Sequence, residues 1–452
     1  MNKVCFFTVV SRNYLPYAQA LMESVARHAP DAERVVILCE PKSEREPTDD
    51  NCQLVSAEQI GVPDLSNMAL RYTIVELNTA VKPLVFNYLL RERGYEKAIF
   101  FDPDIYVYSP LDEMLADLDR HDILLTPHLQ APIGDECSPT EIEILQSGAY
   151  NLGFIAMRRG EVAEWFVNWW ARRLTTLCIV DKPRGLFLDQ KWVDLVPGMF
   201  PGVKVVRHPG WNVAYWNLRN RRLARSGAGF TVNDVPLVFF HFSGFRGGDY
   251  GLSAHENPYS NRPLPADLQG LLDQYKKRLE EHDPGALGET PGYCYLEDGT
   301  HLPDIAKQAL RSVCAERGIP IPDERNRIFA LLNEKIEQVG PGQPLLSRLE
   351  FYVYSTRADI QALFPGVPYI HQKQFARWFV QAAPREYGLS DAWLSALYET
   401  AGVNAEATKA SPITTQILRI FDRSPRLRRS VRRLVSRNWR QRLRYWMLRI
   451  NR

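Results

Sequence analysis

The stretch that decides the fold is Phe100-Phe101-Asp102-Pro103-Asp104-Ile105, in which an apolar run passes directly into two aspartates. The apolar run from residue 98 to 101 is typical of a buried strand, so the two acids stand where that strand ends. In an open α/β sheet, ligands bind at the carboxyl ends of the strands. Two carboxylates two residues apart on such a turn can converge on one Mg²⁺ or Mn²⁺ ion, because both cations prefer hard oxygen ligands. The stretch therefore predicts an α/β sheet with a divalent-metal site at its edge.

Apolar runs and helix-like segments alternate through the first half of the chain, which is typical of a sheet with crossover helices. We expect strands at residues 4–10, 35–38, 98–101, 123–125, 154–157 and 236–240, and helices at 15–28 and 79–93. After a linker at 284–292 that contains Gly and Pro, helical periodicity predicts helices at 305–316, 326–338, 357–364, 372–383 and 391–400. The sequence thus predicts an α/β domain over residues 1–284, a small helical domain over 300–405 and a tail over 411–452.

The acid pair is a weak signal alone, because Asp117-Leu118-Asp119 has the same spacing in a polar, helical context. Further motifs give it weight. Six segments occur in order along the first 260 residues: Phe7-Thr8-Val9-Val10-Ser11-Arg12-Asn13-Tyr14, Lys82-Pro83, Phe101-Asp102-Pro103-Asp104, Tyr150-Asn151-Leu152-Gly153, Leu188-Asp189-Gln190 and His241-Phe242-Ser243-Gly244. Together they resemble the GT-A glycosyltransferases, most closely those related to glycosyltransferase family 8.

The resemblance implies a mixed, Rossmann-like central sheet and a role for each segment. The residues implied to hold a nucleotide-sugar donor are Thr8, Ser11, Asn13, Tyr14, Lys82, Asp102, Asp104, Gly153 and Gly244. The residues implied to face the reacting sugar are Asn151, Asp189 and Gln190, and those implied to bind Mn²⁺ or Mg²⁺ are Asp102, Asp104 and His241. The Lys-Pro-Trp that often follows Gly244 in the family is absent here, which makes Arg246 the local candidate for a phosphate contact.

Each segment also has a purely structural interpretation. His241 follows an apolar run and can be a core histidine, while Asp189 can be a helix N-cap. Asn151-Leu152-Gly153 can be a turn before a strand, and Lys82 can mark an exposed helix start. The segment at residues 211–217 alternates aromatic and amide side chains, so it either lines a sugar site or packs in the core.

The activity implied by the resemblance is transfer of a sugar, with retention, from a nucleotide sugar, expected to carry UDP. The expected acceptor is a glycan or lipid-linked glycan in bacterial surface polysaccharide synthesis. A sugar-phosphate nucleotidyltransferase is one alternative, although it needs a Gly-rich basic loop after the first strand, where this chain has Ser11-Arg12-Asn13-Tyr14. A non-catalytic glycan-binding or membrane scaffold subunit is the other, and the intact acids and histidine count against it.

Charge is distributed unevenly along the chain. Residues 411–452 contain 13 Arg and one acid, a net +12 that leaves −10 for residues 1–410 of the total +2. Apolar residues recur at three- and four-residue steps between the arginines, which predicts a basic amphipathic helix or helix pair over 419–452 that binds an anionic membrane surface. Packing on the acidic body is an alternative, and nucleic-acid binding is the least expected partner.

The cysteines and the lengths of the apolar runs predict the subcellular location of the protein. The seven cysteines are scattered without paired metal-ligand spacing, which favours reduced thiols in the cytoplasm. The chain has no stretch of about 18 apolar residues, the length needed to cross a bilayer. We therefore expect a cytoplasmic protein on the inner face of the cell membrane.

Overall fold

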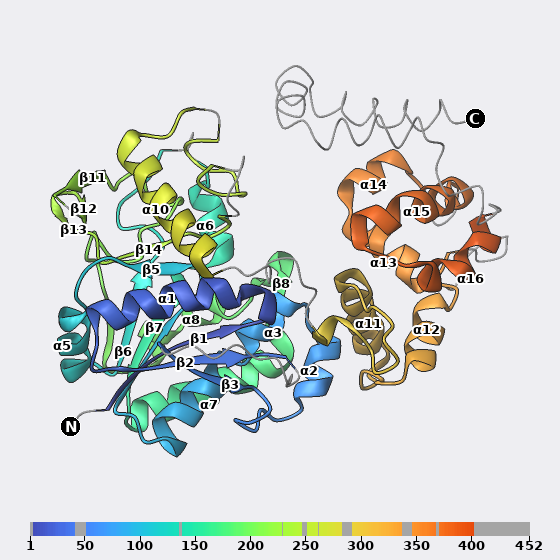
Figure 1. The fold of residues 1–452 in the computed structure, drawn as a ribbon. Helices are drawn as coiled ribbons and strands as arrows, with labels where there is room; N and C mark the ends of the chain where they lie inside the picture. The colour runs from blue at the N-terminus through green and yellow to red at the C-terminus, as the bar shows by residue number, and fades with distance from the viewer. Residues whose placement is uncertain are drawn as a thin grey trace. The chain divides into compact units, whose positions relative to one another are not determined.

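The structure, a computed structural model, describes residues 3–40, 51–134, 138–227, 229–245, 251–260, 262–282, 292–336, 346–367 and 370–401. The chain divides into two compact units, residues 1–293 and 294–452 (Figure 1). The candidate phosphate ligand Arg246 and the expected basic tail over 411–452 lie outside the described residues.

A seven-stranded mixed sheet forms the centre of the first unit (Figure 1), in the order β10-β6-β7-β4-β1-β2-β3. Its strands are β1 (Val4–Val10), β2 (Glu33–Leu38), β3 (Gln53–Ser56), β4 (Lys97–Phe101), β6 (Ile123–Pro127), β7 (Tyr150–Arg158) and β10 (Val203–Val205). Within this sheet β7 runs antiparallel to both of its neighbours, and the other pairs are parallel. The beginning of β7 therefore lies at the same edge of the sheet as the end of β4. The expected α/β class with a mixed sheet is confirmed.

Helices cover both faces of the sheet, and alternate strand residues pack against opposite layers. Phe6 and Phe101 belong to the core beneath α1 (Leu15–His28) and α5 (Asp112–Arg120). Phe7 and Phe100 belong to the core on the other face, with α3 (Ile74–Ala80), α4 (Lys82–Asn87) and α7 (Glu161–Leu177). The unit also contains α2 (Leu65–Arg71), α6 (Glu141–Ser147), α8 (Gln190–Val193), α9 (Val196–Met199), the β8–β9 pair (Val180–Asp181 and Leu186–Phe187) and α10 (Ala266–His282), which packs on α1.

The expectation of one continuous helix over residues 79–93 is wrong. Helix α3 ends at Ala80, α4 begins at Lys82, and a π-helical turn follows at Tyr88–Glu92. Pro83 has no amide hydrogen and cannot donate to the turn before it, whereas proline is well tolerated in the first turn of a new helix. The break thus makes Lys82 the first residue of α4.

The single strand expected at residues 236–240 is also divided. Its start forms β13 (Val235–Pro236), which joins β11 (Leu223–Ser226) and β12 (Gly229–Val232) in a small antiparallel sheet. Its end forms β14 (Phe239–His241), which pairs antiparallel with β5 (Ile105–Val107) and places His241 opposite Ile105. This pairing carries His241 to the strand that immediately follows Asp104.

The described part of the second unit consists mainly of helices. Its helices are α11 (Asp304–Arg317), α12 (Arg325–Asn333), α13 (Arg348–Thr356), α14 (Ala358–Leu363), α15 (Gln372–Tyr387) and α16 (Asp391–Ala401). Helix α13 was not among the helices expected from the sequence, and its segment Phe351-Tyr352-Val353-Tyr354 has strand-like composition. A capping box between Ser347 and Glu350 begins that helix in spite of its composition.

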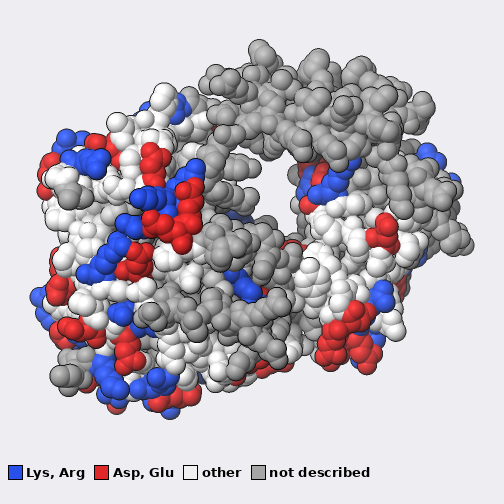
Figure 2. Space-filling view, viewed as in Figure 1, with Lys and Arg blue, Asp and Glu red and all other residues white. Residues whose placement is uncertain are grey.

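Two properties of the described residues are relevant to the expected position of the protein at a membrane. None of the described helices combines the length and the apolar character needed to cross a membrane. On the face of the first unit drawn in Figure 2, acidic and basic side chains intermingle.

Candidate active site

The candidate site lies outside the carboxyl ends of β1 and β4. Strand β1 has β2 on one side and β4 on the other, so the strand order reverses at this point of the sheet. Such a reversal leaves a crevice that binds ligands in open α/β sheets. Ser11 follows β1 and Asp102 follows β4, while the amide of Asp102 donates to the carbonyl of Gly153 near the start of β7 at 2.7 Å. Three expected segments therefore meet at one edge.

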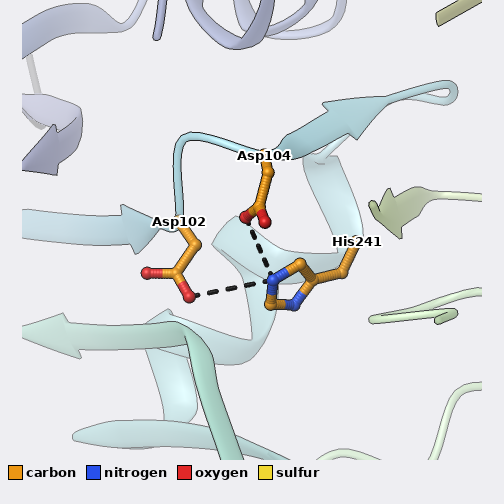
Figure 3. A group of neighbouring side chains, drawn as sticks. All are labelled: Asp102, Asp104 and His241. Carbon is orange, nitrogen blue, oxygen red and sulfur yellow. Dashed lines mark ion pairs between the residues drawn. The ribbon is translucent and has the colours of Figure 1, made fainter. Parts of the chain in front are cut away.

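Asp102, Asp104 and His241 converge on one point, as Figure 3 shows. Nε2 of His241 lies 3.1 Å from Oδ1 of Asp104 and 3.8 Å from Oδ2 of Asp102, and the three ligand atoms lie within 4.8 Å of one another. The imidazole is buried, whereas the two carboxylates are partly exposed. Carboxylate oxygens with one imidazole nitrogen form a suitable ligand set for a divalent ion. The group can thus hold a divalent metal, as the motifs predict.

A network of amide hydrogen bonds holds the far side of the His241 ring. Nδ1 of His241 lies 3.2 Å from Oδ1 of Asn151, which also accepts from the amide of Gly153 at 3.1 Å and from Nδ2 of Asn212 at 3.0 Å. Gly153 makes room for this arrangement, because a Cβ at that position would lie 2.4 Å from Cε1 of His241. Asn151 and Gly153 of the Asn-x-Gly motif therefore pack directly against the His241 ring.

Lys82 is buried, with 4% of its surface exposed, which excludes the exposed helix start considered above. Its Nζ lies 3.0 Å from Oδ2 of Asp189 and 3.4 Å from Oδ1 of Asp102, and it donates to the carbonyl of Leu152 at 3.1 Å. The ammonium also lies 4.3 Å from the centre of the Phe100 ring. One buried cation thus joins a candidate metal ligand to the acid expected beside the donor sugar.

Burial and mutual attraction act in opposite directions on the pKa values of these groups. Burial raises the pKa of Asp102 and of Asp189, and the Lys82 ammonium partly offsets both increases. Burial opposes protonation of Lys82, but Asp102 and Asp189 outweigh it and raise the pKa of the ammonium. For His241, burial also opposes protonation, and Asp104 and Asp102 again leave the pKa above its ordinary value.

Asp189 and Gln190 open α8 next to the site. The Asp189 side chain makes no capping hydrogen bond and pairs with Lys82 instead, so the N-cap interpretation does not describe it. Nε2 of Gln190 donates to the carbonyl of Ser147 at 2.9 Å, and its Oε1 lies 3.5 Å from the amide of Leu152. Leu188, just before Asp189, has a φ of 50°, a left-handed conformation that is strained for leucine.

The residues expected to hold the nucleotide lie in different parts of the first unit, some in a turn at the site and one inside a strand. Ser11, Asn13 and Tyr14 lie in the turn after β1, where the Ser11 hydroxyl donates to Oδ1 of Asn13 at 2.6 Å. Thr8 lies inside β1 with no exposed surface, and its hydroxyl has no hydrogen-bond partner in the described part of the chain. Gly244 follows β14 with a φ of 72°, and its carbonyl accepts from the amide of Ala254 at 2.8 Å.

Four polar or aromatic residues surround His241 and Asn151, and two of them, Thr126 and His128, were not singled out in the sequence. Trp216, with its ring 5.2 Å from that of His241, and Asn212 are both buried, so this part of the 211–217 segment supports the histidine and is not an open sugar wall. Thr126 accepts from Nδ2 of Asn212 at 2.8 Å, and Nε2 of His128 lies 3.3 Å from Nδ2 of Asn151. Thr126 and His128 stand at the end of an apolar strand, the signal that had marked Asp102.

The second acid pair has a structural role. Asp117 is buried in α5 and pairs with Lys204 at 2.6 Å and with Arg120 at 2.7 Å, while Asp119 pairs with Lys97 at 2.6 Å. Both carboxylates already have cationic partners. Among the described residues, the one group of three candidate metal ligands is that of Asp102, Asp104 and His241.

Comparisons with known proteins give distant matches. No family model matches the chain. Two Bacillus subtilis (strain 168) proteins described as uncharacterized are similar: YfnD is 25% identical over 54% of this chain and 79% of its own length, and YfnF 26% identical over 61% and 91%.

Solved structures of glycosyltransferases are also similar to this chain. The galactosyltransferase LgtC, in complex with donor and acceptor sugar analogs, matches with a TM-score of 0.37 and 13% identity over 64% of this chain and 97% of LgtC. The glycosyltransferase GlyE of Streptococcus pneumoniae TIGR4 matches with a TM-score of 0.37 and 12% identity over 62% and 63%. At these values the likeness decides neither activity nor substrate, which have to be inferred from the site.

Proposed function

We propose that this chain is a metal-dependent glycosyltransferase that moves a sugar from a nucleotide sugar, with UDP as the nucleotide, to a hydroxyl of a glycan or lipid-linked glycan. The observation that carries the proposal is the Asp102–Asp104–His241 group, placed at the point where the strand order reverses and joined through Lys82 to Asp189. Asp102, Asp104 and His241 would hold a divalent ion, which when bound would supply positive charge opposite the negative charge of the diphosphate leaving group.

The residues of the site suit the charges that develop during such a transfer. As the bond between the sugar C1 and the diphosphate oxygen breaks, the electron pair stays on the phosphate and positive charge grows on the sugar ring. The Asp189 carboxylate, held by Lys82 at 3.0 Å, is preorganised to stabilise that charge. The acceptor oxygen then bonds to C1, and its proton passes to the departing diphosphate. Attack from the face that the diphosphate leaves gives retention, which we infer from the resemblance to family 8.

We propose bacterial surface polysaccharide synthesis at the inner face of the cell membrane as the setting. The support is the Arg-rich composition of residues 411–452, which fits an anionic surface.

Ligand-dependent thermal stability tests the proposal, because a ligand that binds the native state raises the melting temperature. A panel of nucleotide sugars and free nucleotides should be screened with and without Mn²⁺, using the full chain. We expect stabilisation by one class of nucleotide sugar, dependent on Mn²⁺ and lost in Asp104→Ala. A chain that binds glycans but no nucleotide sugar would favour the scaffold alternative, and turnover of a sugar phosphate with a nucleoside triphosphate would favour the nucleotidyltransferase.

A further inference from the structure

We propose that Asn151 is a positioning residue, which fixes the tautomer of His241 so that Nε2 presents a lone pair to the metal. The family resemblance implies instead that Asn151 faces the donor sugar. The inference rests on the proposed metal site and explains how the neutral histidine is prepared for that role. It follows from the hydrogen bonds made by one oxygen atom.

The identity of that oxygen is settled by its partners. An amide oxygen and an amide nitrogen are hard to distinguish by shape, so the assignment depends on the hydrogen-bond network. Here the backbone N–H of Gly153, which can only donate, points at Oδ1 of Asn151 from 3.1 Å. Nδ2 of Asn212 donates to the same atom from 3.0 Å. An acceptor is therefore required at this position, and Oδ1 is the acceptor that Asn151 has.

The tautomer of His241 follows from that assignment. Nδ1 of His241 lies 3.2 Å from Oδ1 of Asn151, and two atoms that both accept would repel each other at this distance. Nδ1 must then carry the proton. In a neutral imidazole the other nitrogen has a lone pair, and Nε2 is the nitrogen that faces Asp104 at 3.1 Å and Asp102 at 3.8 Å. That lone pair and the carboxylate oxygens are all acceptors, so a cation between them would relieve their repulsion, and without a cation Nε2 also attracts a proton. The Nδ1–H form is the tautomer that a metal ligand needs.

The oxygen of the Asn151 amide has little capacity left to accept from a sugar hydroxyl, and one of the two N–H groups on Nδ2 faces His128. The oxygen accepts from three donors, and Nδ2 lies 3.3 Å from Nε2 of His128. Burial lowers the pKa of His128 to about 4, so this ring is neutral and its Nε2 can accept. With 8% of its surface exposed, Asn151 faces the protein interior.

Without Asn151 the balance of tautomers should reverse. In the metal-free protein the carboxylate of Asp104 attracts a proton on Nε2, which would give a hydrogen bond there and block the metal. Asn151 opposes this attraction from the other side of the ring. Partners that orient a metal-bound histidine typically contribute about 10- to 100-fold to metal affinity. Loss of the Asn151 oxygen should therefore weaken metal binding without removing any ligand.

Nitrogen-15 NMR of the full chain with labelled histidine measures the tautomer directly, in metal-free protein at alkaline pH where the ring is neutral. The His241 signal is assigned by its loss in His241→Gln. We expect wild-type protein to show Nδ1–H, and Asn151→Leu to shift the ring toward Nε2–H. Thr126→Val is the matched control, since it removes the outer hydrogen bond of the same network and leaves the contact between Asn151 and His241. It should retain Nδ1–H.

Direct titration with Mn²⁺, followed by electron paramagnetic resonance of the free ion, supplies the second readout. Asn151→Leu should weaken Mn²⁺ binding by about 10- to 100-fold, and Thr126→Val should leave it close to wild type. An Nε2–H tautomer in the wild-type protein overturns the inference even if Asn151→Leu does not fold. Equal Mn²⁺ affinity in wild type and Asn151→Leu also overturns it while leaving the proposed function intact. Absence of Mn²⁺ binding in wild type would instead remove the metal site.

Discussion

The ammonium of Lys82 lies 3.0 Å from Oδ2 of Asp189, and both side chains are buried. Lys82→Met should leave the buried acid Asp189 and the partly exposed acid Asp102 without their shared cation, which raises the pKa of both. We expect a large loss of turnover, together with a fall in the free energy of unfolding of about 3–5 kcal/mol, typical for one lost partner of a buried ion pair.

Lys97 offers a matched control for this substitution. It is also buried, but its Nζ pairs with Asp119 and donates to the carbonyl of Leu115 at 2.8 Å, away from the site. Lys97→Met should lower stability in denaturant unfolding and leave turnover per folded molecule unchanged. Equal losses of turnover in the two variants would show that Lys82 acts through stability alone.

Gly153→Ala should displace His241, because the new Cβ would lie 2.4 Å from its Cε1 and 2.6 Å from its Nδ1. Real Cβ atoms do not approach that closely, so the ring or strand β7 has to move and the metal ligands separate. We expect Mn²⁺ affinity to fall at least about tenfold, measured by direct titration. Gly270→Ala in α10, where a Cβ meets nothing within 4 Å, should leave affinity unchanged. If Gly153→Ala bound Mn²⁺ with wild-type affinity, the assignment of His241 as a metal ligand would be contradicted.

Metal affinity should depend on pH through His241. Burial opposes protonation of the ring, but Asp104 and Asp102 raise its pKa above the ordinary value of 6.5. A protonated Nε2 cannot bind a metal, so proton and metal compete. Affinity for Mn²⁺ should therefore be highest at pH values above the raised pKa of His241. It should fall as pH decreases through that pKa, by up to about tenfold per pH unit. Titrations from about pH 5 to about pH 8 measure this. A profile flat over that range contradicts the assignment of His241 as ligand.

Local patterns were enough to predict the edge of the sheet where the site lies. The apolar run at 98–101 forms β4 and delivers Asp102 to the carboxyl edge, because a buried strand is recognisable from its own residues. The position of His241 was expected only from the order of motifs. It depends on pairing of β14 with β5, a contact between distant segments that no local pattern encodes.

The burial of Lys82 could not be predicted, since lysine is rarely buried unless paired and its partners Asp102 and Asp189 come from two other segments. The break before α4 was missed because Pro83 can either kink a helix or begin one. Thr126 and His128 could have been found. They follow the apolar residues of β6 just as Asp102 follows β4. Polar residues after a second apolar strand could therefore have been predicted to lie at the same edge of the sheet as Asp102.

The expected membrane tail over residues 411–452 lies outside the described residues, and its function stays a prediction. Each Arg near an anionic surface contributes about 1 kcal/mol, so partial engagement of the 13 arginines would hold the protein there. Co-sedimentation with vesicles that contain or lack anionic lipid should show binding of the full chain to the anionic vesicles alone. A chain truncated after Ala410 should stay in the supernatant. Equal sedimentation of both chains removes the tail from this account.

Cleavage of a nucleotide sugar by the full chain tests the central claim most directly, with wild type, Asp104→Asn and Asp117→Asn compared in the presence and absence of Mn²⁺. The two aspartates belong to acid pairs of the same spacing, one at the candidate metal group and one in structural ion pairs. We predict Mn²⁺-dependent release of the nucleoside diphosphate by wild type and Asp117→Asn, and at least about a hundredfold loss in Asp104→Asn. Undiminished, metal-independent release in Asp104→Asn would contradict the account.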